Sequence, residues 1–319
     1  SGPATVAALG ATLIPAMANA GYEKSTAAAL MSTAGAIGIV IPPSITFVVY
    51  GSVTGTGIGA LFMSGIVPGI LIGVVIYFAM KLTSRGRELH GTPKATGKER
   101  LKAFWSALGG IMMPVIILGG IYGGIFTPTE AAAVAAVYGF IVGIFIYRTI
   151  NSVKMLFEIF SASMQATAVV MIVVTCAGLY SWVASTVGLV ERGSALLLSV
   201  SDDPWIVLLM INIILLLAGM LLDAISIYYV FLPFMLPIMS HFQWDPIWFG
   251  IMMTVNLAVG QVTPPVAVNL YVGANISGLT MEEISKAALP LIGAAILALV
   301  LIVLFPGLST FMPRLLGLS

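Results

Sequence analysis

The sequence predicts an all-α polytopic membrane protein that contains an internal repeat. The 319 residues are 60% hydrophobic and only 8% charged, and their mean hydropathy is +1.11. Soluble domains carry about 25% charged residues, so most of the surface of this chain is expected to face lipid. The second observation is a set of prolines and glycines that recurs along the chain at one fixed spacing.

Composition and motifs argue against several classes of function. The net charge of +1 gives no basis for binding nucleic acid. Cys176 is the only cysteine, which excludes an intrachain disulfide and a thiolate metal cluster. The sequence has no nucleophile elbow, phosphate-binding loop or metal-binding helix motif. We therefore predict that the chain is not an enzyme.

Five apolar stretches are clear full-length candidates for crossing the bilayer, which takes about 20 residues. They are Ala60–Leu82, Phe104–Phe126, Ala131–Tyr147, Phe157–Val187 and Ala287–Phe305. The others are interrupted by Gly or Pro, namely Pro3–Ala18, Ser25–Ser52, Trp205–Leu222, Ala224–Ser240 and Pro246–Ile276. Broken helices occur in membranes only where protein or a water-filled cavity satisfies the freed backbone. We therefore expect the functional site in the interrupted stretches.

The polar stretch Thr83–Lys102 is rich in Lys and Arg and is therefore placed on the cytoplasmic side. Tracing the chain outward from it leaves all of the 13 Lys and Arg residues inside except Arg192 and Arg314. This trace treats the residues before Ala18 and the segment Trp205–Ser240 as re-entrant hairpins that do not cross the bilayer. Treating them as full spans gives a poorer charge distribution, which favours the hairpins.

A shift of 222 residues, from Pro15 to Pro237, places four prolines of the first 68 residues on other prolines. The matched pairs are Pro15 with Pro237, Pro42 with Pro264, Pro43 with Pro265 and Pro68 with Pro290, and the shift also places Gly38 on Gly260 and Gly51 on Gly273. In the traced topology the two copies cross in opposite directions. Such inverted repeats are typical of secondary transporters, so we favour a carrier over a channel or a membrane enzyme.

Each copy contains a Pro-Pro pair shortly after a glycine, Pro42-Pro43 and Pro264-Pro265. Proline lacks an N–H and clashes with the carbonyl four residues earlier. The carbonyls freed in this way are those of Gly38, Ile39, Gly260 and Gln261. Unpaired carbonyls in a bilayer are costly unless something binds them, and Na⁺ is a hard cation that takes oxygen ligands. We predict a Na⁺ site at each break, assisted by Ser44 and Thr263; the alternative is two kinks satisfied by neighbouring helices.

Asp223 is the second candidate ligand because it lies within an apolar run. A carboxylate in such a place costs about 2.5–3.5 kcal/mol on insertion scales, and it would be a suitable ligand for a cation. The alternative is that Asp223 caps the helix that follows, and both roles are compatible. Its counterpart in the first copy is Ser1, followed by Gly2. Since the spacing places the beginning of the second copy near Phe104, we expect the matching part of the first copy to lie upstream of Ser1.

At these motifs the sequence resembles the large membrane (M) subunit of tripartite ATP-independent periplasmic (TRAP) transporters, the dicarboxylate and sialic acid permeases. The strings that carry the resemblance are Ser1-Gly2-Pro3-Ala4-Thr5, Ala20-Gly21-Tyr22, Ile41-Pro42-Pro43-Ser44, Thr127-Pro128-Thr129-Glu130, Asp245-Pro246 with Phe249-Gly250, and Thr263-Pro264-Pro265. They span nearly the whole chain. The usual Ser-Gly-Ser of the family is represented here by Ser1-Gly2-Pro3.

The resemblance implies an elevator-type transporter with two re-entrant hairpins and two unwound helices. In this scheme residues 1–58 form the first hairpin and broken helix of a transport domain. Residues 59–156 form scaffold helices with a cytoplasmic basic loop at 83–102. Residues 157–279 form the second hairpin and broken helix, and residues 280–319 form a C-terminal scaffold helix.

The resemblance also implies ligands for the two sodium ions and the solute. The first Na⁺ site joins Ser1, Gly2, Gly38, Pro42 and Ser44. The second Na⁺ site joins Asp223, Gly260, Thr263 and Pro264. The solute is expected between the hairpin tips, near Ser44 and Asn269.

The implied function is import of a small acidic solute, of the C4-dicarboxylate or sialic acid type, by Na⁺ symport across the bacterial inner membrane. The implied partners are a small four-helix membrane subunit and a periplasmic substrate-binding protein. The alternative is a stand-alone Na⁺-coupled carboxylate transporter of the ion-transporter superfamily, which would work without a soluble partner. No motif selects one solute.

Overall fold

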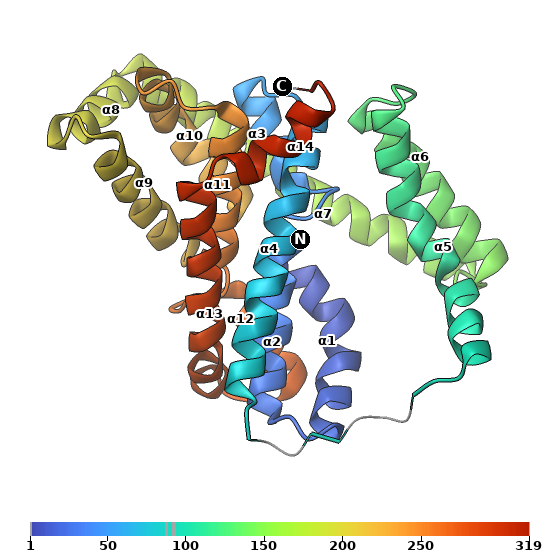
Figure 1. Cartoon of the computed structure of the whole chain (residues 1–319). Helices are drawn as coiled ribbons and strands as arrows, with labels where there is room; N and C mark the ends of the chain where they lie inside the picture. The colour runs from blue at the N-terminus through green and yellow to red at the C-terminus, as the bar shows by residue number, and fades with distance from the viewer. Residues whose placement is uncertain (1, 87–88, 91–93, 319) are drawn as a thin grey trace. The chain divides into compact units, whose positions relative to one another are not determined.

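The computed structural model describes residues 2–86, 89–90 and 94–318, and all the regular structure in these ranges is helical. The chain divides into two compact units, a large one of Ser1–Gly91 with Ala177–Ser319 and a small one of Thr92–Cys176. The helices are α1 (Gly2–Asn19), α2 (Lys24–Ile37), α3 (Ile45–Thr54), α4 (Ile58–Thr83), α5 (Gly97–Tyr122), α6 (Pro128–Ile141), the π-helix η1 (Val142–Ile146), α7 (Val153–Thr186), α8 (Leu189–Val200), α9 (Pro204–Gly219), α10 (Ala224–His241), α11 (Pro246–Gly260), α12 (Val268–Ser277), α13 (Met281–Leu304) and α14 (Gly307–Leu315) (Figure 1).

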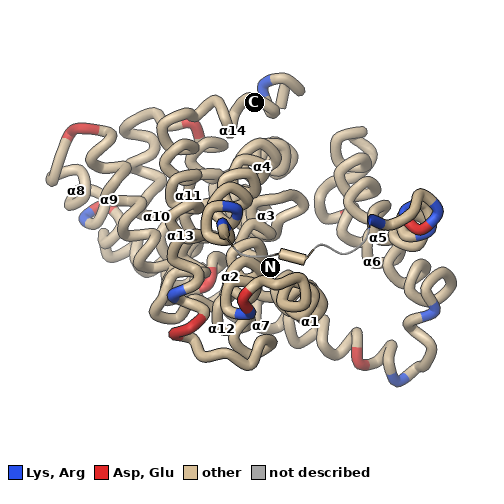
Figure 2. The backbone as a smooth tube through the Cα atoms, turned by 60° about the horizontal axis from the view of Figure 1, so that its bottom comes forward, with Lys and Arg blue, Asp and Glu red and all other residues tan. Residues whose placement is uncertain are grey.

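Within the described ranges, six helical segments are long and apolar enough to cross a membrane, namely α4, α5, α6 with η1, α7, α10 and α13. Five of them correspond to the five full-length apolar stretches predicted from the sequence. The sixth, α10, belongs to a segment expected to form a re-entrant hairpin, and its 18 residues permit a crossing. The few charged residues lie at or near helix ends and in connecting segments (Figure 2). The chain is therefore a multi-pass membrane protein.

The helix boundaries repeat at the spacing predicted from the sequence. A shift of 222 residues (Gly2 to Ala224) carries α1 onto α10 at both ends. The same shift carries α2, α3 and α4 onto α11, α12 and α13 to within one residue at every boundary. The predicted duplication is thus confirmed by the order and length of four consecutive helices.

The two copies contact one another reciprocally within the large unit. The helix α1 packs against α12, just as its counterpart α10 packs against α3, and the equivalent helices α4 and α13 pack against each other. Reciprocal contacts of this kind are what an approximate two-fold axis produces. In Figure 1, α4 begins at the top and ends at the bottom, whereas α13 ends at the top, where α14 begins. The two copies therefore run in opposite directions.

Two buried tyrosines join the copies in the core of the large unit. Tyr50 of α3 and Tyr228 of α10 are fully buried and lie edge to face, with ring centroids 5.9 Å apart. The Tyr50 hydroxyl donates to the carbonyl of Pro246 at 2.7 Å, and the Tyr228 hydroxyl lies 2.5 Å from the Thr254 hydroxyl. Because buried hydroxyls need such partners, these contacts fix how α3 and α10 meet.

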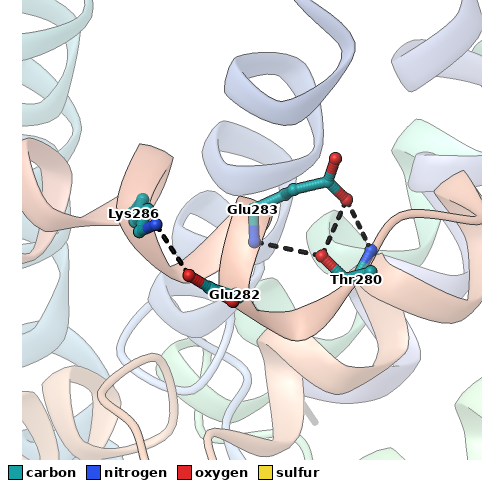
Figure 3. A network of polar contacts seen from close by, with 4 residues as sticks. All are labelled: Thr280, Glu282, Glu283 and Lys286. Atoms are coloured by element: carbon teal, nitrogen blue, oxygen red, sulfur yellow. Dashed lines mark hydrogen bonds and ion pairs between the residues drawn. The ribbon is translucent and has the colours of Figure 1, made fainter.

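Three spans begin with the same side-chain arrangement, which Figure 3 shows for α13. Glu283 N donates to Thr280 Oγ1 at 3.3 Å, and Thr280 N donates to the Glu283 carboxylate at 2.8 Å. This capping box satisfies backbone donors that the first turn of a helix leaves free. The same boxes begin α5, with Thr96 and Glu99, and α6, with Thr127 and Glu130. The Lys286–Glu282 pair at 2.7 Å is exposed and adds little.

The small unit holds α5, α6, η1 and the first part of α7. Tyr138 donates to the carbonyl of Gly109 at 3.0 Å, and Tyr147 donates to that of Ser106 at 2.7 Å, so α5 is tied to the segment α6–η1. By contrast, α4 packs on α13, α2 and α14 and belongs to the large unit. The predicted division of the chain into transport and scaffold parts stays a prediction.

Close packing of α4 on the first helix break predicts unequal effects of two glycine substitutions. A Cβ on Gly65 would clash with the carbonyl oxygen of Val40 and lie 2.7 Å from Phe47 Cε2. We expect Gly65→Ala to cost about 1–3 kcal/mol, because a backbone carbonyl cannot move aside. Gly73→Ala on the same helix meets nothing within 4 Å and should leave stability unchanged or slightly raised.

The check is thermal unfolding of the two purified variants in detergent beside the unaltered protein. A lower Tm for Gly65→Ala alone is the expected result. Equal Tm values for the two variants would contradict this packing.

Candidate functional site

The two Pro-Pro motifs interrupt helices at equivalent places in the two copies. The helix α2 ends at Ile37 and α3 begins at Ile45, while α11 ends at Gly260 and α12 begins at Val268. Both Pro-Pro peptide bonds, Pro42-Pro43 and Pro264-Pro265, are cis. The predicted unwound stretches are therefore confirmed as breaks between short helices.

Three oxygen atoms crowd together at the first break. The carbonyl of Ile39 accepts from Ser44 Oγ at 2.5 Å and from Thr46 Oγ1 at 2.9 Å. The two hydroxyl oxygens are themselves 2.6 Å apart, and both side chains are buried. Two hydroxyl protons cannot serve three contacts at once. The first break thus holds three close oxygen–oxygen contacts, one more than the two hydroxyl protons can bond.

Donors within and just beyond the breaks bond carbonyl groups that we expected to have no donor. At the second break the carbonyl of Gln261 accepts from Asn269 N at 3.1 Å, and that of Gly260 accepts from Thr263 N at 3.0 Å. The expectation of carbonyls without donors was therefore wrong for Ile39, Gly260 and Gln261. The physical reason is that the turn before Pro264 and the chain after both Pro-Pro pairs supply new donors. A carbonyl oxygen has two lone pairs. The carbonyls of Gly260 and Gln261 each accept one hydrogen bond and keep one lone pair for a further ligand, whereas that of Ile39 already accepts two.

Asp223 lies in the turn between α9 and α10, with its side chain exposed. Its Oδ1 accepts from Ile225 N at 3.0 Å and from Ser226 N at 3.1 Å, and its Oδ2 accepts from Ser226 Oγ at 2.5 Å. The capping alternative is thus confirmed. Ser1, its counterpart in the first copy, lies outside the described residues, whereas Gly2 is the first residue of α1.

A contact between two glycines brings this turn to the second break. A Cβ on Gly260, the last residue of α11, would lie 2.7 Å from the backbone of Gly219, the last residue of α9. Only glycine at both places lets the two helix ends approach so closely. The absence of a side chain at Gly260 thus allows the end of α9 to pack against the end of α11.

One cavity of about 140 Å³ connects the breaks and the helix starts within the large unit. Its lining comes from both copies and includes Gly2, Ile39, Ile45, Thr46, Asp223, Ala224, Gln261 and Val268. Four of these residues are the first residues of α1, α3, α10 and α12, namely Gly2, Ile45, Ala224 and Val268. Four helix N-termini therefore meet at this cavity, and the ends of α2 and α11 lie two residues or less from Ile39 and Gln261.

Two buried amide oxygens near this cavity have no hydrogen-bond partner in the described part of the chain, Gln261 Oε1 and Asn269 Oδ1. A Cβ on Gly2 would lie 2.6 Å from the first and 2.9 Å from the second, so both oxygens crowd the start of α1. Asn269 Nδ2 donates to the carbonyl of Ser32 at 3.3 Å. A buried acceptor without a donor costs about 1–3 kcal/mol, which a bound cation or solute donor would recover.

The structure brings some of the predicted site residues together and leaves others apart from the cavity. Gly2 and Asp223 line it. Ser44 touches the lining residue Thr46, and Asn269 lies against Gly2. The remaining predicted ligands, which belong to the breaks but do not line the cavity, are Gly38, Pro42, Gly260, Thr263 and Pro264.

Sequence reasoning missed the side chains of Thr46 and Gln261. Thr46 stands two residues beyond Ser44, and Gln261 was noted for its carbonyl only. An amide or hydroxyl directly beside a proline break is the signal that could have found both. By contrast, neither the apolar residues around Thr46 and Gln261 nor their spacing along the helices indicates that these two side chains line a cavity.

The ligand chemistry of the cavity is that of oxygen atoms. Among the described residues, no group of three or more His, Cys, Asp or Glu side chains is placed to hold a metal ion. Hydroxyl, amide and carbonyl oxygens with one carboxylate suit a hard cation rather than a transition metal. Lys and Arg do not occur among the residues that line the cavity.

The fold and the cavity define a polytopic membrane protein in which residues of two mirrored helix breaks line one largely apolar cavity with a few polar groups. Comparison with known families gives a match of residues 1–308 to the family described as "Tripartite ATP-independent periplasmic transporter, DctM component". The chain belongs to this family, and the resemblance drawn from the motifs is confirmed.

Curated relatives agree with the family match. An isethionate TRAP transporter permease protein, DctMQ, of Oleidesulfovibrio alaskensis is 41% identical over 98% of this chain and 49% of its own length. A C4-dicarboxylate TRAP transporter large permease protein, DctM, of Pseudomonas aeruginosa is 38% identical over 100% of this chain and 74% of its own length. A sialic acid TRAP transporter large permease protein, SiaM, of Vibrio cholerae is 33% identical over 96% and 72%. The chain thus spans about half of the first relative and about three quarters of the other two.

Ser44 and Thr46 share the Ile39 carbonyl as acceptor, so we predict that substitutions at the two residues have non-additive effects on stability. Ser44→Ala or Thr46→Val alone leaves Ile39 with one hydroxyl donor, whereas the double variant leaves its carbonyl with neither. We expect the double variant to lose more stability than the sum of the single losses, by about 0.5–3 kcal/mol.

Thermal unfolding of the four proteins of this cycle is the measurement. Thr33→Val and Ser64→Ala form the control pair, since these buried hydroxyls donate to separate carbonyls, those of Ala29 and Ala60. The control pair should be additive. Additivity in the Ser44 and Thr46 pair would rule out a shared acceptor.

Proposed function

We propose that the chain is the large permease subunit of a Na⁺ symporter that imports a small acidic solute across the bacterial inner membrane. The observation that carries the proposal is the cavity of about 140 Å³ at which both helix breaks and four helix N-termini meet. Family membership supports the class of transporter. The cation and the class of solute follow from the electrostatics of this cavity.

Helix ends supply partial charges of both signs. The N-terminus of a helix carries partial positive charge and attracts anions, and the C-terminus attracts cations. The starts of α1, α3, α10 and α12 line the cavity and would favour the carboxylates of a solute. The ends of α2 and α11 at the breaks would favour Na⁺. This use of discontinuous helices is the one that known carriers employ.

The single carboxylate in the cavity supports coupling between the solute and Na⁺. An anionic solute would lie near Asp223, and Lys and Arg are missing from the lining. Two negative groups that lie close together repel one another unless cations accompany them. Solute binding would thus depend on Na⁺, and by reciprocity Na⁺ binding would depend on the solute.

The proposed cation sites follow the two breaks. The first combines Ser44 and its partners Ile39 and Thr46 with the start of α1 and with Gly38 and Pro42. The second combines Asp223 with the segment from Gly260 to Pro264. The unpartnered oxygens of Gln261 and Asn269 lie between the two and would contact the solute or an ion. Asn269 thereby keeps its proposed role in solute binding.

A small acid fits this cavity better than a nine-carbon sugar acid. The volume of about 140 Å³ favours a solute of four carbons or fewer. The relatives whose names refer to isethionate and C4-dicarboxylate are 41% and 38% identical, against 33% for the sialic acid permease. We therefore propose a C4-dicarboxylate or a similarly small acid as the solute.

We also propose an elevator mechanism and two partners. The cavity lies entirely within the large unit, as is needed if one body carries the solute across the membrane. Gly2 at the start of α1 and Asp223 before α10 would lie at the tips of two re-entrant hairpins. The partners would be a small four-helix membrane subunit and a periplasmic substrate-binding protein, since the family description names a periplasmic transporter with several components.

The proposal is tested by uptake into proteoliposomes that contain the whole protein with its small subunit. Radiolabelled succinate, isethionate and sialic acid are each supplied with the binding protein, under an inward Na⁺ gradient or with choline in its place. We expect uptake of a small acid only with both Na⁺ and the binding protein. Uptake that ignores Na⁺ would refute the symport, and uptake without the binding protein would favour a stand-alone carrier.

The charge of Asp223 can be separated from its capping role by substitution with asparagine. Asn caps helices about as well as Asp, so Asp223→Asn should keep its Tm while uptake at limiting Na⁺ falls roughly ten- to hundredfold. Asp203→Asn is the matched control, because Asp203 caps α9 in the same way and does not line the cavity. Normal uptake by Asp223→Asn would remove the carboxylate from the second cation site.

A further inference from the structure

A second and larger hollow lies between α2 and α4, remote in its lining from the functional cavity. Its volume is about 1020 Å³, and its walls are mostly apolar. The side chains of Leu30, Met31 and Ile37 come from α2, and those of Ile76 and Met80 come from α4. We call this hollow the α2–α4 groove. Such a long apolar groove beside a membrane span suits a hydrocarbon chain.

One end of the α2–α4 groove is basic. Lys81 lies in the last turn of α4 and Arg85 lies two residues beyond its end, and both line the groove. Neither makes an ion pair with another residue in the described part of the chain. The C-terminus of α4 adds partial negative charge that holds the two cations in place. Two cations therefore face the groove without an ion-pair partner among the residues that the structure describes.

Ser84 supplies an independent sign of a missing ligand. It is the C-cap of α4, lines the same end of the groove and is 8% exposed. Its hydroxyl has no hydrogen-bond partner. Buried hydroxyls in native structures are almost always bonded. A hydroxyl between two cations is the donor set that recognises a phosphate oxygen.

We propose that the α2–α4 groove binds an anionic phospholipid. Its phosphodiester would contact Lys81, Ser84 and Arg85, and an acyl chain would lie along the apolar walls. The basic stretch that begins here is placed on the cytoplasmic side, and basic pockets between helices on that side attract anionic head groups. A ligand with a phosphate at the membrane surface and a hydrocarbon tail within it matches both ends of the groove.

Native mass spectrometry of the whole purified protein with added phosphatidylglycerol measures this binding. Phosphatidylcholine of the same chain length serves as the neutral comparison. We expect one phosphatidylglycerol bound in preference to phosphatidylcholine. The double variant Lys81→Ala/Arg85→Ala should bind it roughly thirtyfold more weakly.

The matched control for charge is Lys98→Ala/Lys102→Ala. These lysines have the same spacing near the end of a span, are exposed on α5 and do not line the groove. The control should keep the affinity of the unaltered protein. An equal loss in both double variants would mean general attraction to charge and would overturn the proposal. Ser84→Ala, which keeps both cations, should weaken binding by a smaller factor and serves if the double variant is unstable.

The apolar part of the groove is tested by filling it. Gly73 lines the groove, and a Cβ there would meet nothing within 4 Å, so Gly73→Leu should occupy the path of the acyl chain without straining the fold. Gly293→Leu on α13 is the control, since Gly293 is equally open but lies outside the groove. We expect loss of phosphatidylglycerol from the first variant alone.

Competition separates a lipid from a free anion. Inorganic phosphate and glycerol phosphate, which lack acyl chains, should not displace the bound lipid at millimolar concentration. Displacement by either one, or unchanged binding in Gly73→Leu, would show that the site takes a free phosphate or that another segment fills the groove. Either result would overturn the proposal.

Discussion

The large unit depends on one constraint. The hydrocarbon of a bilayer holds no water, so the protein itself must bond every backbone N–H and C=O group. Two Pro-Pro pairs remove backbone hydrogen bonds at equivalent places in the two copies. The carbonyls at these breaks accept instead from donors of Ser44, Thr46, Thr263 and Asn269. Not every buried polar group is satisfied, because the side-chain amide oxygens of Gln261 and Asn269 have no hydrogen-bond partner in the described part of the chain. These unsatisfied acceptors lie where the two copies meet, which supports the proposal that a ligand binds there.

The inverted arrangement of the copies turns local helix ends into a shared electrostatic environment. A single broken helix presents one N-terminus and one C-terminus. Two copies that run in opposite directions bring together the starts of α1, α3, α10 and α12 at one cavity. The cavity can thus attract an anion without a basic side chain, while Asp223 and the breaks attract cations. Under the proposed function, binding of both charges at this one cavity would link the duplication to symport.

Much of this organisation could be predicted from the sequence, since proline and glycine act locally. The repeat, the two breaks and the capping role of Asp223 follow from residue types at fixed positions. Partners across the fold could not be predicted in the same way. The approach of Gly260 to Gly219, the donors to Gln261 and Gly260, and the exposure of Thr46 to the cavity depend on tertiary packing between distant helices. The α2–α4 groove was missed for the same reason, because Ser84 shows its unbonded hydroxyl only once it is buried.

The most direct measurement of the central claim is a pair of high-resolution cryo-EM maps of the whole protein, one in sodium chloride and one in choline chloride. The account predicts density at both helix breaks in sodium, within coordination distance of the oxygens of Ser44 and of the Gly260–Pro264 segment, and its loss in choline. Identical maps with no density at either break would contradict the claim that the mirrored breaks hold a cation.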